Sequence, residues 1–246
     1  VGVFHRFFKQ IFERANAVQA ISHFLATWSV RMGFKGTPKV IPNGVDVARF
    51  TAVYEPSTLS QLRADWHVAK EDILIVTASR LVLKNGTDDL IRSLTSLPKE
   101  YKLIIAGDGD DRDKLRVLTE QKQLTDRVVF LGSLSHDQLP AVLKACDIFC
   151  RPSLSEGLGN SFLEAMAAGL PIIGTPVGGI PDFLTDGETG VFCQPRDPES
   201  IAKAAIRIQT EPGLREKLIK QGAELALKGY DWESISKGIG QMLKEI

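Results

Sequence analysis

Hydrophobic positions from residue 72 onward fall into short continuous runs separated by stretches with helical spacing. The run 73–78 is apolar and rich in β-branched residues, as is typical of a strand buried on both faces. The same reasoning predicts strands at 102–106, 128–131, 148–150, 171–174 and near 191–192, with helices at 87–97, 111–122, 136–145 and 161–169. Alternating strands and helices joined by short Gly-rich loops predict an α/β fold with a Rossmann-like, doubly wound parallel sheet.

Both ends of the chain add helices to this core. Phe4, Phe7, Phe8, Ile11 and Phe12 recur at helical spacing and predict a helix at 3–15. A strand is expected at 17–21, a helix at 23–33 capped by Ser22 and closed by Gly33, and a strand at 39–41, while helices at 198–210, 212–227 and 231–244 end the chain. Because the chain begins inside the Phe-rich helix, we interpret it as a fragment of a longer protein. We expect that helix and the last helix to pack on each other or on a neighbouring molecule.

Composition excludes several classes of protein. Thirty basic residues balance thirty acidic ones, so no global field favours nucleic acid, and any anion site must be local. No apolar run approaches the roughly 20 residues needed to cross a bilayer. The three cysteines (Cys146, Cys150 and Cys193) form no even disulfide set, which favours packed thiols and a cytoplasmic setting. The four histidines are scattered, and we expect each to be a surface or packing residue.

Candidate ligand groups follow the strands, where open parallel sheets bind their ligands. Arg80 and Lys84 lie in the loop after 73–78, where fixed cations would stabilise the charge that builds up on a pyrophosphate leaving group. The alternative is that either residue is an ordinary solvated surface charge. Asp108-Gly109-Asp110 resembles a metal-binding Asp-x-Asp pair, but its flanking glycines favour a turn that caps the next helix.

The loop around Gly132, Ser133 and Leu134 carries no charge. It offers backbone groups and a flat apolar wall, which would suit a nucleobase. A plain joint between a strand and a helix would have the same sequence.

The segment 151–182 holds two glutamates, Glu156 and Glu164, separated by seven residues. Between them, Gly157, Leu158 and Gly159 precede Asn160 and Ser161, which open an Ala-rich helix. A Gly-rich bend that enters a helix offers free N–H groups to an anion. Carboxylates accept hydroxyl protons instead, so the two features together indicate a nucleotide sugar.

Structural alternatives exist within the same segment. Ser161 and Glu164 have capping-box spacing, so Glu164 could return to the backbone of its own helix. Glu156 has no structural role that the sequence assigns. Asp182, after Gly178 and Gly179, is either a helix cap or a polar wall of the site.

The pattern Glu156-x7-Glu164 resembles the signature of retaining GT-B glycosyltransferases of family 4, the glycosyl transferases group 1. The resemblance runs along essentially the whole chain through further segments: 40–46, 79–82 with Lys84, 106–109, 152–153, 164–171, 177–182 and 187–190. Asp182 stands where the family often has Glu, and the varying spacing from Arg to Lys adds Asn85 as a neighbour of the diphosphate site.

This resemblance implies a division of the chain. Residues 1–38 would be the remnant of an N-terminal acceptor domain and linker, 39–228 the donor-binding domain, and 229–246 a helix crossing back toward the N-terminal domain. The acceptor, a glycan or lipid, would bind the N-terminal domain. The fragment alone would bind nucleotide and transfer little or no sugar.

The resemblance also implies residue roles. Arg80 and Lys84 would neutralise the diphosphate of a UDP- or GDP-linked sugar, and Glu164 would bind the ribose. Glu156 would bind the donor sugar, and backbone amides at 159–161 would contact sugar or phosphate. Neither cofactor nor metal would be needed, and peripheral association of the full-length protein with the inner face of a membrane is compatible with this assignment. The alternatives are a non-catalytic nucleotide-binding module, or another GT-B enzyme such as a phosphorylase or sugar epimerase.

Overall fold

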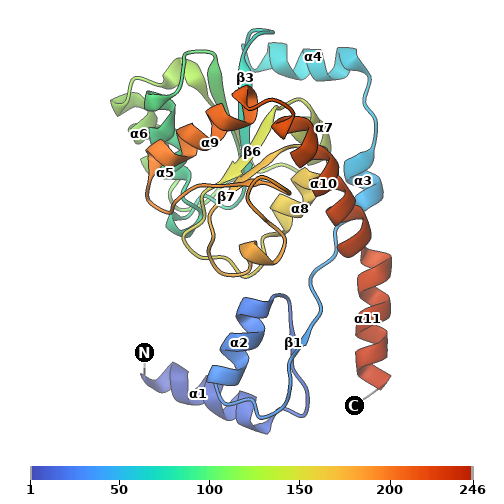
Figure 1. Cartoon of the computed structure of the whole chain (residues 1–246). Coiled ribbons are helices and arrows are strands. Elements are labelled where there is room, and N and C mark those ends of the chain that lie inside the picture. The colour runs from blue at the N-terminus through green and yellow to red at the C-terminus, as the bar shows by residue number, and fades with distance from the viewer. Residues whose placement is uncertain (1, 245–246) are drawn as a thin grey trace.

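A six-stranded parallel sheet forms the centre of the molecule in the computed structural model, which describes residues 2–244 (Figure 1). Its strands are β3 (Ile73–Ala78), β4 (Tyr101–Ala106), β5 (Val128–Gly132), β6 (Ile148–Arg151), β7 (Ile172–Gly174) and β8 (Val191–Phe192). The order is β5-β4-β3-β6-β7-β8, with every pair parallel. Strands β4 and β5 are therefore added on one side of β3, and β6, β7 and β8 on the other. The carboxyl ends of β3 and β6, between which the strand order switches, mark the expected ligand crevice. The predicted fold class is confirmed.

Helices cover both faces of the sheet because the strand residues alternate between two apolar clusters. Leu74 and Val76 pack with residues of α7 (Leu139–Lys144) and α8 (Asn160–Ala167). Ile75 between them packs with residues of α5 (Thr87–Ser93), α6 (Arg112–Gln121) and α9 (Pro198–Thr210). α10 (Leu214–Gly229) contributes to both clusters. Within residues 2–244, no helix combines the length and apolar character needed to span a membrane.

Several element boundaries differ from the predicted ones. The helix predicted at 87–97 is α5 followed by a 3₁₀ turn, η2 (Leu94–Ser96). The helix predicted at 136–145 begins as a turn and becomes regular only in α7, although the Ser135–Gln138 capping box forms in both directions at 3.0 and 3.3 Å. Helices α3 (Val47–Thr51) and α4 (Pro56–Asp65) were not predicted. α4 has no fully buried residue, and only Leu59 and Leu62 pack partly buried against the core, so the apolar face on which such a prediction depends is weak. The remaining 3₁₀ turns are η1 (Leu83–Asn85), η3 (Thr125–Arg127) and η4 (Ile180–Asp182).

The N-terminal segment folds as a small unit of its own. It contains α1 (Gly2–Arg14), β1 (Gln19–Ala20), α2 (His23–Arg31) and β2 (Lys39–Val40), with β1 and β2 paired in parallel. The Ser22 hydroxyl accepts the Leu25 N–H at 3.2 Å, so the predicted cap of α2 is confirmed. β2 begins directly after the predicted division at residue 38, which stays a prediction.

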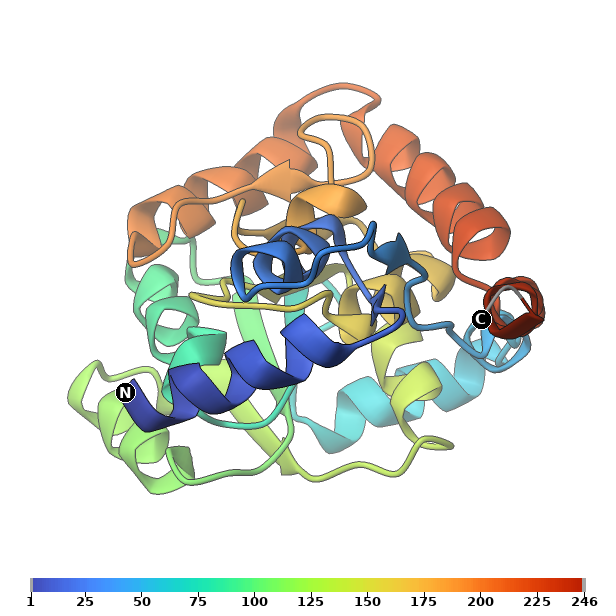
Figure 2. The ribbon, with the colours of Figure 1, turned by 90° about the horizontal axis from the view of Figure 1, so that it is seen from below.

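Of the two expectations for the Phe-rich helix α1 and the last helix, α11 (Trp232–Lys244), the first, that they pack on each other, is wrong, and packing on a neighbouring molecule stays a prediction. The two helices lie apart in both views of the molecule (Figures 1 and 2). Phe8 and Phe12 of α1 instead meet the ring of Trp28 on α2, edge to face, with centroids 6.0 and 5.5 Å apart. α11 lies beside the segment 41–44, where Trp232 packs against Gly44. Proximity along the chain explains this packing, because only residues 15–22 separate α1 from α2. Residues 245–246 of the predicted C-terminal segment lie outside the described residues.

Candidate functional site

A cavity of about 400 Å³ lies at the carboxyl ends of β3, β4 and β5. The loops that follow these strands form most of its wall, and α8 contributes the rest. Its lining residues are Ala78, Ser79, Arg80, Ala106, Gly107, Asp108, Ser133, Leu134, His136, Leu139, Ser161 and Glu164. Four of the predicted site residues therefore meet in one cavity: Arg80, Ser133, Ser161 and Glu164.

Glycines let the loops after β3 and β4 approach each other closely. Gly107 has φ of 145°, and a Cβ atom there would lie 1.9 Å from the Ser79 carbonyl oxygen. The Leu81 N–H donates to the Asp108 carbonyl at 2.9 Å, which links the loops directly. The Asp108 carboxylate pairs with Arg112 at 3.2 Å and accepts the Gly109 N–H at 2.8 Å. Asp108 is thus engaged in the loop, in agreement with the predicted turn.

Arg80 supplies a cation without a carboxylate partner at the cavity. Within residues 2–244, neither Arg80 nor Lys84 forms an ion pair, and both side chains are exposed. Lys84 lies in η1 outside the cavity lining, and its carbonyl accepts the Leu154 N–H at 2.7 Å. The Ser79 hydroxyl, also on the cavity wall, is buried without a hydrogen-bond partner among the described residues. The cavity therefore offers a free cation and a free hydroxyl to an anionic ligand.

Asn85 is buried and is hydrogen-bonded to the backbone of the loop that carries Arg80. Its Nδ2 donates to the Arg80 carbonyl at 2.6 Å, and its Oδ1 accepts from Arg151 Nη2 at 3.0 Å. Both halves of the amide are thus bonded within the protein. Asn85 holds the backbone of Arg80 and does not face the cavity.

Glu164 is not part of a capping box. Gly159, with φ of 92°, is the N-cap of α8, so the helix begins at Asn160 and Ser161 already lies in its first turn. The Ser161 hydroxyl accepts instead from Arg151 Nη1 at 3.1 Å. Glu164 lines the cavity, where burial raises the pKa of its carboxyl group while His136 and Arg151 oppose that shift. The carboxylate is free to accept hydroxyl protons from a ligand.

Glu156, for which the sequence assigned no structural role, has one. Its Oε2 pairs with Arg151, and its Oε1 accepts the Gly157 N–H at 3.0 Å. The residues after it are packed: Gly157 lies against Leu25 of α2, and Leu158 is in the core. The bend therefore presents Glu156 in one fixed orientation.

The second Gly-Gly segment lies on the backbone of this bend. The Gly179 N–H donates to the Glu156 carbonyl at 3.1 Å, and a Cβ atom at Gly178 would lie 1.8 Å from that oxygen. Asp182 then accepts the His23 N–H at 2.7 Å. Of the two roles considered for Asp182, the structure supports the helix cap, and the helix it caps is α2.

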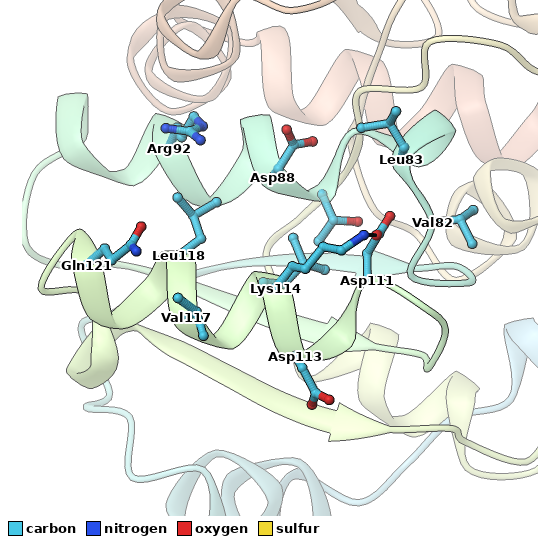
Figure 3. Close-up of a pocket in the computed structure, with 12 residues that line it drawn as sticks. Val82, Leu83, Asp88, Arg92, Asp111, Asp113, Lys114, Val117, Leu118 and Gln121 are labelled. Atoms are coloured by element: carbon cyan, nitrogen blue, oxygen red, sulfur yellow. Dashed lines mark hydrogen bonds and ion pairs between the residues drawn. The ribbon is translucent and has the colours of Figure 1, made fainter.

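Two further cavities lie near the site. One of about 540 Å³ shares His136 and Glu164 with the first cavity and adds residues 44–50, Asn160, Asp231 and Trp232. Asn160 accepts there from Asn43 Nδ2 at 3.3 Å. The other, of about 620 Å³, lies between α5 and α6 and is lined by residues such as Leu83, Val117 and Leu118 (Figure 3). It contains none of the predicted site residues.

Sequence reasoning missed Arg151 and His136. Arg151 is buried at the end of β6 and binds three predicted site residues, Glu156, Asn85 and Ser161. The sequence feature that could have indicated Arg151 is its position at the end of an apolar strand. An arginine buried there needs polar partners within the protein. His136 is a surface residue, as expected, but it also lines two cavities beside Glu164.

Residues 60–225 match the family model of glycosyl transferases group 1. The chain belongs to this family. Members similar to it include the uncharacterized glycosyltransferase MJ1607 of Methanocaldococcus jannaschii, which is 32% identical over 201 residues, or 81% of this chain and 52% of that protein. A GDP-mannose-dependent alpha-(1-6)-phosphatidylinositol monomannoside mannosyltransferase of Mycobacterium tuberculosis is 30% identical over 83% of this chain and 55% of that protein. This chain thus spans about half the length of these two relatives.

Solved structures of glycosyltransferases share the fold. Anabaena Alr3699/HepE, solved with UDP and glucose, superposes with a TM-score of 0.92 at 25% identity, covering 100% of this chain and 68% of that one. Sucrose-phosphate synthase from Thermosynechococcus elongatus superposes with a TM-score of 0.89 at 26% identity, covering 100% of this chain and 62% of that one. The parallel sheet described above is therefore the sheet of a GT-B glycosyltransferase.

Proposed function

We propose that this chain binds a nucleotide-diphosphate sugar as the donor-binding part of a retaining glycosyltransferase. One observation carries the proposal: the unpaired cation of Arg80 and the carboxylate of Glu164 line the same 400 Å³ cavity at the carboxyl ends of the strands. A cation there binds a diphosphate, and a carboxylate accepts protons from ribose hydroxyls. The unpartnered Ser79 hydroxyl adds a further polar group for the same ligand.

The nucleobase would lie against the loop after β5. Gly132 has φ of 73°, and Ser133 and Leu134 line the cavity beside it without adding a charge. This wall accepts a flat base through backbone groups and apolar contact. Alr3699/HepE was solved with UDP, and the mycobacterial relative depends on GDP-mannose, so we propose a UDP- or GDP-linked donor.

The proposed chemistry uses fixed charges. Arg80 and Lys84 would stabilise the charge that grows on the departing diphosphate, as preorganised cations lower such barriers. Glu156 would accept hydroxyl protons of the donor sugar, because a carboxylate has about four acceptor positions and its protein partners occupy two. The backbone from Gly159 to Ser161 would contact the sugar or phosphate at the start of α8. We propose that these groups suffice without a bound metal and that the sugar is transferred with retention.

The acceptor would be a glycan or lipid held by the remainder of the full-length protein. A cytoplasmic setting, at or near the inner face of a membrane, fits three free, buried thiols. Retention can be measured as the anomeric configuration of the product that the full-length enzyme forms.

Calorimetric titration of the 246-residue chain tests the proposal directly. UDP, GDP and ADP, each alone and linked to glucose or mannose, would be compared with the variants Arg80→Gln and Glu164→Gln. We expect one nucleotide to bind and each variant to weaken binding by about ten- to a hundredfold, as the loss of a charge-assisted hydrogen bond does.

Arg92→Gln is the matched control. Arg92 is exposed on α5 and lines the cavity between α5 and α6, so this variant removes the same positive charge as Arg80→Gln without touching the site. Absence of binding by every nucleotide, or an equal loss in all three variants, would overturn the proposal. Binding by a full-length protein that transfers and hydrolyses no donor would favour the non-catalytic module.

A further inference from the structure

We propose that Arg151 is a positioning residue that fixes the donor-sugar carboxylate Glu156 and couples it to the loop that carries Arg80. This proposal rests on the proposed function. Arg151 ends β6, next to the point where the chain order of the sheet reverses. It is only 8% exposed, so its charge must be satisfied by neighbouring protein groups.

Three elements meet at the Arg151 guanidinium. Nη2 pairs with Glu156 Oε2 and donates to Asn85 Oδ1 at 3.0 Å, while Nη1 donates to Ser161 Oγ at 3.1 Å. These partners come from the bend before α8, from η1 after β3, and from the first turn of α8. Arg151 is thus bonded to three segments that carry proposed contacts to the sugar or the diphosphate.

The network continues to the diphosphate loop. Asn85 uses its Oδ1 for Arg151 and its Nδ2 for the Arg80 carbonyl at 2.6 Å. A continuous path of hydrogen bonds therefore runs from Glu156 through Arg151 and Asn85 to the backbone of Arg80. The orientation of the sugar-binding carboxylate and the position of the phosphate-binding cation depend on the same guanidinium.

Arginine suits this position better than lysine. Its planar fork donates along several fixed directions at once, whereas an ammonium group is a compact point charge on a flexible stem. The guanidinium also lies over the ring of Phe162, 5.7 Å from its centroid, which fixes its plane. The Arg151 Nε is buried without a partner within residues 2–244, so the outer nitrogens do the positioning.

The loss of Arg151 should weaken recognition of the sugar part of the donor more than recognition of its nucleotide part. Glu156 is also nearly buried, with an 11% exposed side chain, so its free acceptor positions are useful only in the orientation that Arg151 imposes. Without Arg151 the carboxylate loses its counter-ion and turns. The sugar part of the donor should then be recognised poorly, while ribose and base contacts at Glu164 and the loop after β5 remain.

The test is the ratio of two affinities of the 246-residue chain, measured by calorimetry: that for UDP-glucose over UDP, or GDP-mannose over GDP, whichever pair the unmodified chain binds. We expect Arg151→Met to lower this ratio at least about tenfold, as the loss of one charge-assisted hydrogen bond does. Arg151→Lys keeps the charge and should fold, and it should give an intermediate ratio. In a Glu156→Gln background, Arg151→Met should lower the ratio no further.

Arg63→Met is the matched control. Arg63 is also a partly buried, multiply bonded arginine, but it binds Asp147, the Ala145 carbonyl and the Asp72 carbonyl at the amino ends of the strands. It should reduce stability without changing the ratio. An unchanged ratio in both Arg151 variants would overturn the positioning role while leaving the proposed function intact. Failure of the unmodified chain to bind any nucleotide or nucleotide sugar would overturn the proposed function and this inference together.

Discussion

Asp182 binds the backbone of His23, a residue 159 positions earlier in the chain: its Oδ2 accepts the His23 N–H at 2.7 Å. The same oxygen lies 3.2 Å from His23 Nδ1. A carboxylate at this position satisfies a free N–H group at the start of α2 and complements the positive end of the helix dipole. Asp182 therefore attaches the N-terminal segment to the loops that hold Glu156.

Substitution of Asp182 by Ala should destabilise the protein by about 1 kcal/mol, the usual effect of removing a helix cap. The amide of His23 should also exchange its hydrogen faster, because it loses its acceptor. Urea unfolding and hydrogen exchange measure the two effects. His23→Ala is the control: it keeps the backbone N–H and removes a 78% exposed side chain, so its effect should be smaller. Equal losses in the two variants would contradict the backbone cap.

Replacement of Glu164 by Gln should raise the melting temperature by a few degrees at pH 7.5. Burial raises the folded-state pKa of Glu164 above its ordinary 4.5, so the ionised carboxylate destabilises the folded state. The stabilising effect of the protonated acid is complete below pH 4.5 and is lost as the pH rises through the raised pKa. The gain from Gln should accordingly vanish near pH 4.

Thermal unfolding at several pH values measures this difference for Glu164→Gln. Glu120→Gln on α6 serves as the comparison, because Glu120 is exposed and its substitution changes only a surface charge. A melting temperature for Glu164→Gln that is lower than that of the unmodified chain at pH 7.5 would show that the carboxylate stabilises the fold.

Substitution of Gly179 by Ala should destabilise the protein by about 1–3 kcal/mol, the usual cost of overpacking. A methyl group there would lie 2.0 Å from the Gly157 carbonyl oxygen and 2.7 Å from Ser22 Cβ. Nucleotide-sugar binding should weaken as well, because the displaced backbone holds Glu156. Gly240→Ala in α11 meets no atom within 4 Å, and it should stabilise the helix by up to about 1 kcal/mol. Urea unfolding of both variants measures the contrast, and similar stabilities would contradict it.

The three cysteines should be unreactive in the folded protein. Cys146, Cys150 and Cys193 are free and buried. Burial raises the pKa of Cys193 to about 12 and the pKa of the other two thiols well above their ordinary value. Since the thiolate is the reactive form, a colorimetric thiol reagent at pH 8 should label none rapidly. All three should react after denaturation. Rapid stoichiometric labelling of the native protein would contradict the burial.

The local pattern of apolar and capping residues predicted the elements that bury a continuous apolar run or begin with a strong cap. The strand 73–78 and the cap at Ser22 are of this kind, and both formed as expected. α4 has only a weak apolar face, so nothing in its sequence distinguished it from a loop. The spacing of Ser161 and Glu164 suggested a capping box, and that interpretation was wrong. Gly159, in the left-handed conformation, is the N-cap, so the helix begins at Asn160. Spacing alone does not fix where a helix begins.

The sequence by itself determined the order of strands and helices, the parallel sheet, and the segments that reach its carboxyl edge. These properties depend on residue type and local spacing, which a chain retains before it folds. Only the tertiary structure decided how the predicted residues are held: Arg151 joins Glu156 to Asn85, and Asp182 caps a helix 159 residues away. Such bonds depend on which loops the fold brings together, and no local pattern in the chain records that proximity. The carboxylate of Glu156 is therefore visible in the sequence, whereas its orientation is a property of the fold.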